Sequence, residues 1–324
     1  MIGVVYSYLS FYFLIWVLFV MSLSADTLLD RIRMKGEIKK WRNLTIIFAV
    51  LWAIGLMVRV FDLNNLKKEY IASVDIKGII SQSHGRDKKL EFLKDDERVQ
   101  AVIVHINSPG GTMVGGEHLY NSLRKIAEKK PVVAVMGTVA ASAGYMTAIA
   151  ADKIFASEGT MTGSIGVMMQ AAEVTELAEK MGINFITIKS SDLKGTPSFT
   201  EKMTPKAEKA VQDGIDDGYD YFTDLVAQRR SLSKEEVLKL ADGRIYTGRQ
   251  AVNNKLIDAI GKESDAIKWL EKEKNIEEGL KVKNVLIKDK DSMFDMLLNG
   301  SLGFDNPYLS QIFPSSGFVA MWKP

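Results

Sequence analysis

The feature that most restricts the fold is a series of short apolar runs separated by helical patterns. Residues 99–106 contain almost no polar side chain, which is typical of a strand buried on both faces of a sheet. Residues 132–139 form a second such run. Between the two runs, Leu119, Leu123 and Ile126 recur at helical spacing. This alternation predicts an α/β domain with a mostly parallel sheet.

The same pattern continues through most of the chain. Further strands are predicted at residues 70–80, 153–156, 165–169, 184–188 and 280–288. Helices are predicted at residues 115–129, 141–151, 174–181 and 205–230, followed by two or three shorter ones. The long helix is expected to begin at Pro205, because proline after a capping Thr204 suits the first helical position.

Composition excludes several kinds of chemistry. The chain has no cysteine, which rules out disulfides, thiol catalysis and cysteine-bound metals. Its three histidines, His84, His105 and His118, are too scattered to suggest a zinc site. The net charge of +2 gives no indication of nucleic acid binding. We therefore expect neither a metal nor another cofactor.

Two apolar segments near the start predict membrane anchoring. Residues 1–25 are long and uncharged enough for a transmembrane helix, and they lack the basic start and small-residue exit of a cleaved signal peptide. Residues 44–61 predict a second span, shorter and extended by Trp41 and Arg59 as interfacial anchors. A buried core helix is the alternative for this second run.

The linker between the two segments predicts the orientation. Residues 26–43 hold six Lys or Arg side chains against three acidic ones, and the positive-inside rule places such a linker in the cytoplasm. The domain predicted for residues 62–290 would then lie outside the cytoplasm, bound to the cytoplasmic membrane as part of a multi-pass protein. Residues 291–324 form a tail that keeps apolar side chains.

Ser142 follows the second apolar run and lies among alanines and glycine, in the sequence Ala-Ala-Ser-Ala-Gly-Tyr. Small neighbours leave its hydroxyl accessible, and the amide of Ala143 is expected at the start of the next helix. Ordinary helix packing is the alternative. The turn at residues 107–111, Asn-Ser-Pro-Gly-Gly, ends the first run. Its free N–H groups could hold an oxyanion. An ordinary turn between a strand and a helix is the alternative, because it could have the same sequence.

A serine nucleophile needs a base to remove its proton. No histidine follows position 118, so a Ser-His-Asp order with the histidine after the serine is excluded. A lysine can serve as the base if it is neutral. The lysines considered after Ser142 are Lys153, Lys180, Lys189 and Lys194. The spacing does not choose between them, and composition alone leaves Lys194 as a surface residue.

Five segments together resemble the signal peptide peptidase A family of membrane-anchored serine–lysine proteases. They are residues 107–111, 140–145, 162–167, 188–194 and 242–248, in the order of the family, and Leu256-Ile257-Asp258 follows them. The resemblance covers residues 70–290 and implies a Clp-protease/crotonase-like fold. The chain has one copy of the domain and Ala143 where the family usually has glycine.

The resemblance implies a role for each site residue. It identifies Ser142 as the nucleophile, Lys194 as the general base and Ser164 as the hydroxyl that orients the lysine. The backbone N–H groups of Gly111 and Ala143 would form the oxyanion hole, with Gly110 nearby.

The same resemblance implies an endopeptidase that degrades cleaved signal peptides and other apolar peptides at the outer face of the cytoplasmic membrane. Single-copy members of the family suggest assembly into an octameric ring. A crotonase-type acyl-CoA enzyme is disfavoured because it would normally use carboxylates and would not need membrane spans. An inactive membrane scaffold that kept the fold remains the non-enzymatic alternative.

Overall fold

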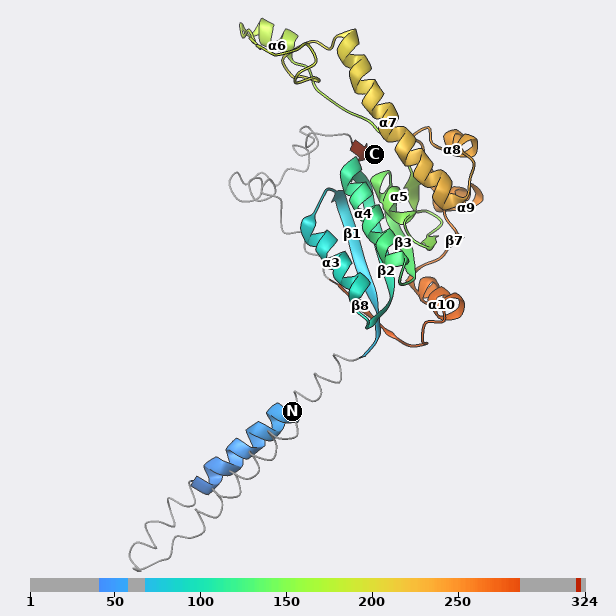
Figure 1. Cartoon of the computed structure of the whole chain (residues 1–324). Coiled ribbons are helices and arrows are strands. Elements are labelled where there is room, and N and C mark those ends of the chain that lie inside the picture. Colours follow the sequence, from blue (N-terminus) through green and yellow to red (C-terminus); the bar gives the residue numbers. More distant parts are fainter. Residues whose placement is uncertain (1–40, 58–67, 286–318, 322–324) are drawn as a thin grey trace, which may run out of the picture. The chain divides into compact units, whose positions relative to one another are not determined.

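The computed structural model describes residues 41–57, 68–285 and 319–321 (Figure 1). The chain divides into two units, Met1–Lys68 and Glu69–Pro324. In the first unit, residues 41–57 form a helix whose large apolar side chains are exposed, including Phe48 and Trp52. No helix within the described ranges is both long and apolar enough to cross a membrane. The predicted span at residues 1–25 lies outside those ranges, and the span at residues 44–61 lies partly outside, so both stay predictions.

The second unit is built on one sheet, which has nine strands in the described part of the chain. Six strands run in the order β6-β5-β3-β2-β1-β8, while β4 pairs with β3 and β7, and β9 pairs with β2. All pairs are parallel except β5 with β6 and β2 with β9. The strands are β1 (Tyr70–Ile80), β2 (Val99–Thr112), β3 (Val132–Ala141), β4 (Lys153–Ala156), β5 (Met161–Gly163), β6 (Ile245–Thr247), β7 (Ala259–Ile260), β8 (Lys281–Asn284) and β9 (Val319–Met321).

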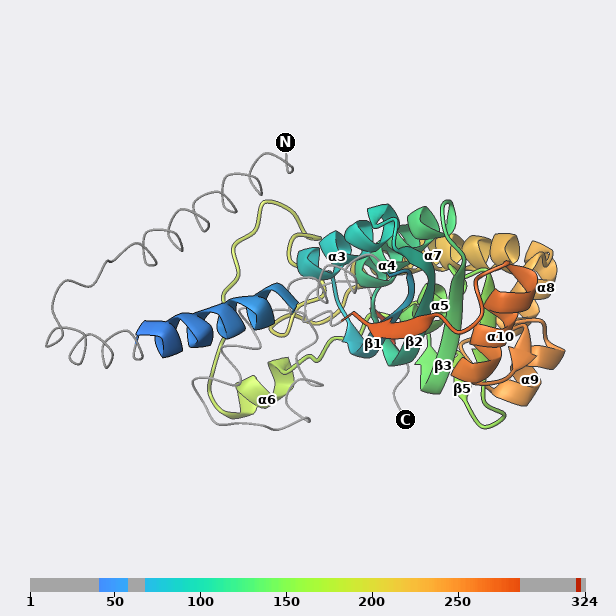
Figure 2. The ribbon, with the colours of Figure 1, turned by 90° about the horizontal axis from the view of Figure 1, so that it is seen from below.

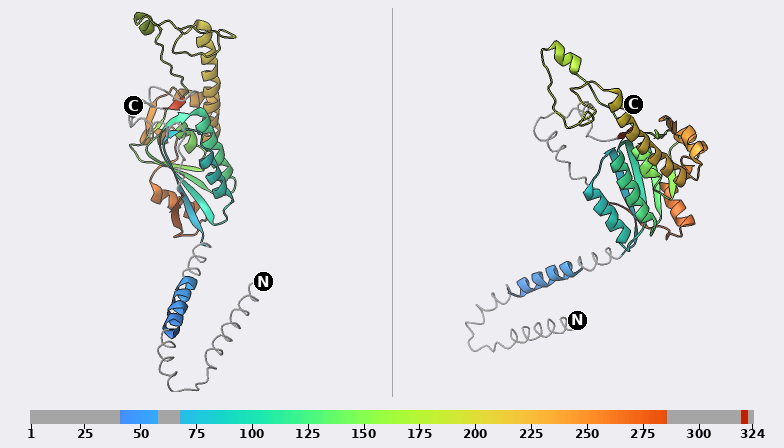
Figure 3. Two further views of the ribbon diagram at one scale, coloured as in Figure 1. Left: turned by 90° about the vertical axis from the view of Figure 1, so that its left-hand side faces the viewer. Right: turned by 45° about the horizontal axis from the view of Figure 1, so that its top comes forward.

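Helices cover both faces of this sheet (Figures 2 and 3). The described helices of this unit are α3 (His84–Asp95), α4 (Met113–Ala127), α5 (Ala143–Ala148), α6 (Thr175–Lys180), α7 (Pro205–Arg230), α8 (Lys234–Leu240), α9 (Gly248–Asn253) and α10 (Glu263–Glu273), of which α6 lies away from the sheet (Figure 1). On one face α3, α4, α5 and the carboxyl half of α7 pack over the strands, and α10 packs on the other face.

The pattern of burial explains the continuous apolar runs. In β2, Val102 and Val104 belong to the core beneath α4, whereas Ala101 and Ile103 belong to the core beneath α10. All four side chains are fully buried. A strand that is covered on both faces cannot alternate apolar with polar residues, so the run becomes continuous.

The prediction of a mixed α/β fold with a mostly parallel sheet is confirmed. Two predicted strands are wrong. Residues 165–169 form no extended strand, and residues 184–188 have no strand partner in the described chain. The latter segment has a strand-like sequence, yet Ile186 and Ile188 are almost fully exposed. Helix α3 was not predicted; it begins at His84, after the N-cap residue Ser83, whose side chain accepts a hydrogen bond from the backbone N–H of Arg86.

Candidate active site

Ser142 lies between the end of β3 and the first turn of α5 and is 1% exposed, so the prediction of an accessible hydroxyl is wrong for the described chain. Its φ and ψ angles are 55° and −118°, a region that costs a non-glycine residue on the order of 1–3 kcal/mol. Two hydrogen bonds of 2.8 Å hold this conformation. The Ser142 N–H donates to the carbonyl oxygen of Gly163, and the Ser142 carbonyl accepts from the N–H of Met146. Strained residues that the surrounding structure holds in place cluster at active sites.

Ser164 occupies the equivalent position on the neighbouring strand. Ala141 of β3 pairs with Gly163 of β5, so Ser142 and Ser164 each follow a member of the same residue pair. Ser164 also has a positive φ of 48° and is 8% exposed. Its N–H donates to the carbonyl oxygen of Arg244 over 2.8 Å. The sheet therefore brings these two predicted site residues to the same edge.

The glycine before Ser164 is required by the space around it. Gly163 has a φ of 82°, and a Cβ atom there would lie 2.7 Å from the ring of Tyr246. The preceding Thr162 is fully buried and donates its hydroxyl to the carbonyl oxygen of Ala140 over 2.7 Å. These contacts fix β5 against β3 and β6, and they fix the position from which Ser164 leaves the strand.

The Gly110–Gly111 turn is the continuation of β2 and lies close to the start of α5. A Cβ on Gly111 would lie 1.8 Å from the carbonyl oxygen of Ile80, so a side chain cannot be placed there. A Cβ on Gly144 would lie 3.0 Å from the carbonyl oxygen of Ser108, which shows how closely α5 approaches this turn.

The predicted oxyanion donors can be compared in this geometry. The N–H of Gly110 donates to the Ser108 hydroxyl oxygen over 3.1 Å and is therefore engaged. Ala143 is the first residue of α5, and the first N–H groups of a helix have no acceptor within that helix. The arrangement suits Ala143 as a donor better than Gly110. The assignment of Gly111 and Ala143 to an oxyanion hole stays a prediction.

The carboxyl end of β2 is also paired with the tail. Residues Gly110–Thr112 pair antiparallel with β9, with Gly111 opposite Ala320. Sequence analysis identified only a tail that keeps apolar side chains. The structure places three of its residues against the edge that carries the predicted oxyanion turn.

Lys194 makes no hydrogen bond to either serine in the described chain. It is exposed and lies in the connection between α6 and α7, where its backbone N–H donates to the carbonyl oxygen of Ser191 over 3.1 Å. No hydrogen bond joins its side chain to Ser142 or Ser164 within the described residues. Its role as the base stays a prediction.

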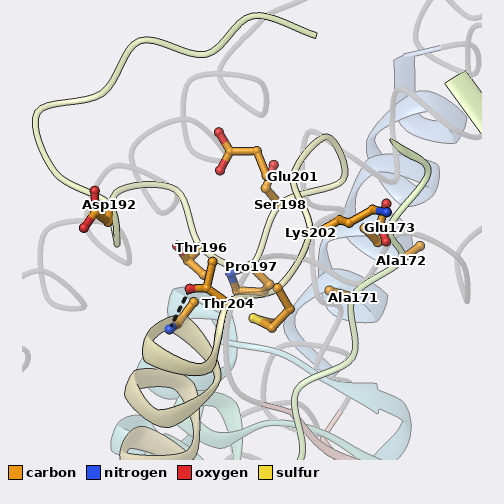
Figure 4. A pocket seen from close by; sticks show the side chains of 12 residues that line it. Ala171, Ala172, Glu173, Asp192, Thr196, Pro197, Ser198, Glu201, Lys202 and Thr204 are labelled. Atoms are coloured by element: carbon orange, nitrogen blue, oxygen red, sulfur yellow. Dashed lines mark hydrogen bonds between the residues drawn. The ribbon is translucent and has the colours of Figure 1, made fainter. Parts of the chain in front are cut away.

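A pocket of about 150 Å³ lies beside this connection, between residues 171–173 and the start of α7 (Figure 4). Thr196, Pro197 and Thr204 form part of its wall, together with acidic side chains such as Glu201. Neither Ser142 nor Lys194 lines it. The pocket is therefore separate from the arrangement of serines and glycines at the sheet edge.

His105 and His118 each lie close to an acidic side chain. His118 Nδ1 lies 3.1 Å from Asp87 Oδ2, and His105 Nε2 lies 3.5 Å from Glu263 Oε2. Neither contact involves Ser142.

Sequence reasoning missed two features that bear on the site. One is the pairing of β9 with β2, since three residues of a tail carry no periodic pattern. The other is a group of hydrogen bonds from Arg124 and Arg229 to the end of α5. Basic residues in the last turn of a helix usually interact with that helix's own end, so no sequence pattern indicates that Arg124 and Arg229 contact another helix.

The chain is similar in sequence to known proteases. A family model described as Peptidase family S49 matches residues 124–277. A protein from Synechocystis sp. named as a protease is 39% identical over 215 residues, which cover 66% of this chain and 76% of that protein. A protein from Enterococcus faecium named as a signal peptide peptidase is 38% identical over 189 residues, which cover 58% of this chain and 55% of that protein.

One more relative and one solved structure were also matched. Protease 4 of Haemophilus influenzae is 35% identical over 209 residues, which cover 61% of this chain and 34% of that protein. A solved structure of a ClpP1 mutant from Listeria monocytogenes covers 60% of this chain and 92% of its own, with 21% identity and a TM-score of 0.40. On the extent and identity of the sequence matches, this chain belongs to peptidase family S49, the serine peptidase family that includes signal peptide peptidase A.

Proposed function

We propose that this protein is a membrane-anchored serine endopeptidase in which Ser142 is the nucleophile and Lys194 the general base. The observation that carries the proposal is the conformation of Ser142. A buried serine with a φ of 55° lies at the end of β3, next to the end of β5 that is followed by Ser164. Family membership supplies the reaction class.

The chemistry follows from these groups. The neutral amine of Lys194 takes the proton from Ser142 Oγ as Oγ bonds to the carbonyl carbon of the substrate. The N–H groups of Gly111 and Ala143 stabilise the resulting oxyanion. When the C–N bond breaks, the lysine ammonium returns its proton to the departing amine. Water then hydrolyses the acyl ester and regenerates Ser142. Ser164 orients the lysine amine throughout.

The substrate would bind as an extended strand. The edge of β2 at Gly110–Thr112 accepts three residues of β9 in antiparallel pairing, and a peptide can add to a sheet edge in the same way. Ile79, opposite Gly110, and Val114, just beyond the pairing, are both largely exposed apolar side chains. They support a preference for apolar peptides, such as the remnants of cleaved signal peptides.

Self-association is part of the proposal, because no hydrogen bond joins the exposed Lys194 to Ser142 or Ser164 within one described chain. The connection that carries Lys194 exposes Phe185, Ile186 and Ile188. A second copy that covers this apolar segment would remove it from water. We propose that assembly, into an octameric ring by resemblance to the family, places the lysine of one copy beside the serine of another.

Anchoring to the cytoplasmic membrane is the remaining part. The helix at residues 41–57 exposes apolar side chains along its length, including Leu44, Phe48 and Trp52. Lipid is a suitable environment for such a surface. The basic linker before it supports a cytoplasmic loop and an extracytoplasmic peptidase domain.

Mixing two inactive variants tests the proposal. Ser142→Ala and Lys194→Ala are each expected to abolish cleavage of a fluorogenic apolar peptide. Mixed after subunit exchange, they should regain activity, because a Ser142→Ala copy still supplies a lysine to the intact serine of its neighbour. The double variant, mixed with either single variant, is the control.

The outcomes separate the parts of the proposal. If both single variants are inactive and their mixture stays inactive after verified exchange, the lysine acts within its own chain and the intersubunit arrangement is wrong. If both single variants cleave like the unmodified protein, the catalytic assignment is wrong and a scaffold role is favoured instead.

A further inference from the structure

Helix α5, which begins directly after Ser142, is too short to hold its own orientation. It has six residues, all of them buried, and isolated helices shorter than about 12–15 residues are marginal in water. Ser142 and the Ala143 amide lie at its amino end. Their direction therefore depends on what fixes α5 from outside.

Two arginines from other helices fix its carboxyl end. Arg229, in the last turn of α7, donates from Nε to the carbonyl oxygen of Ile149 over 2.9 Å and from Nη2 to that of Ala151 over 3.0 Å. Arg124, in the last turn of α4, donates from Nη1 to the carbonyl oxygen of Ala150 over 2.8 Å. Three consecutive carbonyl groups after α5 thus each accept a guanidinium hydrogen bond.

Holding the two arginines here is electrostatically unfavourable for Arg229. Burial, and then the nearby positive charge of Arg124, lower the pKa of Arg229. Two like charges are held close together because the negative end of α5 and the Asp152 carboxylate, 3.4 Å from Arg124, attract both. Planar guanidinium groups can bond two acceptors at once, which an ammonium group cannot do in the same geometry.

We propose that Arg229 and Arg124 are positioning residues for the nucleophile. They tie the carboxyl end of α5 to α7 and α4, and so hold the Ser142 hydroxyl and the Ala143 N–H at its amino end in line with the substrate carbonyl. This inference rests on the proposed function, because it assigns Ser142 as the nucleophile. Neither arginine contacts substrate; both act through the orientation of α5.

The test is Arg229→Lys. This substitution keeps the positive charge but replaces the two coplanar donor nitrogens of the guanidinium group with a single ammonium nitrogen. We expect kcat to fall about ten- to a hundredfold, as for small displacements of reacting groups, with KM changed less than about twofold. The rate of labelling by a serine-reactive fluorophosphonate should fall in parallel. Arg124→Lys should show the same division between kcat and KM, with a smaller effect, because it loses a single carbonyl contact.

A matched control variant separates an effect on catalysis from a general loss of stability. Arg98 forms a two-pronged pair with Asp96, with bonds of 2.9 and 2.8 Å, before the first residue of β2 and at the opposite end of that strand from the glycine turn. Arg98→Lys is expected to lower Tm and to leave kcat unchanged. Equal kcat losses at equal Tm losses in Arg98→Lys and Arg229→Lys would overturn the proposal, as would an unchanged kcat in Arg229→Lys.

These outcomes differ from failure of the proposed function. If Ser142→Ala is still labelled by the fluorophosphonate, the nucleophile is wrongly assigned, whatever the arginine variants do. If labelling depends on Ser142 but not on Arg229, the nucleophile stands and the positioning role is wrong.

Discussion

The N–H of Ser142 donates to the carbonyl oxygen of Gly163 over 2.8 Å, which joins the turn of the proposed nucleophile to the turn that carries Ser164. Because Ala141 and Gly163 are also paired across β3 and β5, the two serines leave the sheet together. A change that moves one turn is expected to move the other. The backbone hydrogen bond and the strand pairing therefore join Ser142 and Ser164 in one structural unit. In the proposed mechanism, the general base must bind next to this unit.

Replacing Ser164 should affect catalysis more than stability. Ser164→Ala removes the hydroxyl proposed to orient the lysine, and we expect kcat to fall about tenfold or more, in the range of general-base effects. Ser231 is the matched control, because it is also a serine with a positive φ, at the end of α7. Ser231→Ala should keep full activity. Steady-state kinetics with thermal denaturation of both variants would test this, and equal activities would contradict it.

Replacing Gly111 should prevent the correct fold of the glycine turn. The new Cβ atom in Gly111→Ala would lie 1.8 Å from the backbone oxygen of Ile80, so the backbone must shift. We expect a loss of about 3 kcal/mol or more in the free energy of unfolding, at the upper end of overpacking effects. Gly159 has no atom within 4 Å of an added Cβ, so Gly159→Ala should be tolerated. Urea denaturation measures both, and a stable Gly111→Ala protein would count against the observed packing.

Asp96 should make stability depend on acid. Hydrogen bonds from Arg98 lower the pKa of Asp96 from 3.8 to about 2. A carboxylate with a lowered pKa in the folded state stabilises the protein above pH 3.8, and this contribution is lost as the pH falls towards 2. The stability difference between the unmodified protein and Asp96→Asn should therefore be constant near neutral pH and shrink below about pH 4.

Asp213, which pairs with Lys209 on the surface over 3.1 Å, provides the comparison. Asp213→Asn should change stability little at any pH, since exposed pairs contribute about 0–1 kcal/mol. Urea unfolding at several pH values gives the required curves. A difference for Asp96→Asn that does not change with acid would show that the Arg98 pair does not act as described.

Disrupting β9 should open the edge of β2. Ala320 lies opposite Gly111 in antiparallel pairing, and proline at position 320 would remove a backbone donor from that strand. If peptide substrates use the same edge, Ala320→Pro should lower KM for an added peptide, while Ala320→Val, which keeps the strand, should not. An unchanged KM in both variants would show that substrate and tail do not compete.

The arrangement of the sheet could be predicted because its central strands are covered on both faces. Residues 99–106 had to be buried, and the long helix beginning at Pro205 followed from its cap and its proline. The strand predicted at residues 184–188 failed for a related reason. Its apolar pattern is real, but Ile186 and Ile188 face no other part of the described chain. An apolar pattern indicates that a segment is stabilised by burial. It does not indicate whether the same chain or another molecule buries it.

Part of the candidate site could be predicted from the sequence, and part could not. Ser142 and the glycine turn could be placed at neighbouring strand ends, because parallel strands end at a common edge. Lys194 could not be placed, since no periodic pattern fixes a long connection. The arginine contacts to the carboxyl end of α5 could not be predicted either, because the contacts of Arg124 and Arg229 depend on how α4 and α7 pack in three dimensions.

Covalent labelling tests the central claim most directly. A fluorophosphonate probe should label the unmodified protein on one serine, identified as Ser142 by peptide mass, and should not label Ser142→Ala. Labelling of Lys194→Ala should be at least about a hundredfold slower, as expected for loss of a general base. Lys206→Ala, which removes another exposed lysine near the start of α7, should be labelled at the normal rate. Labelling of Ser142→Ala at the rate of the unmodified protein would contradict the account.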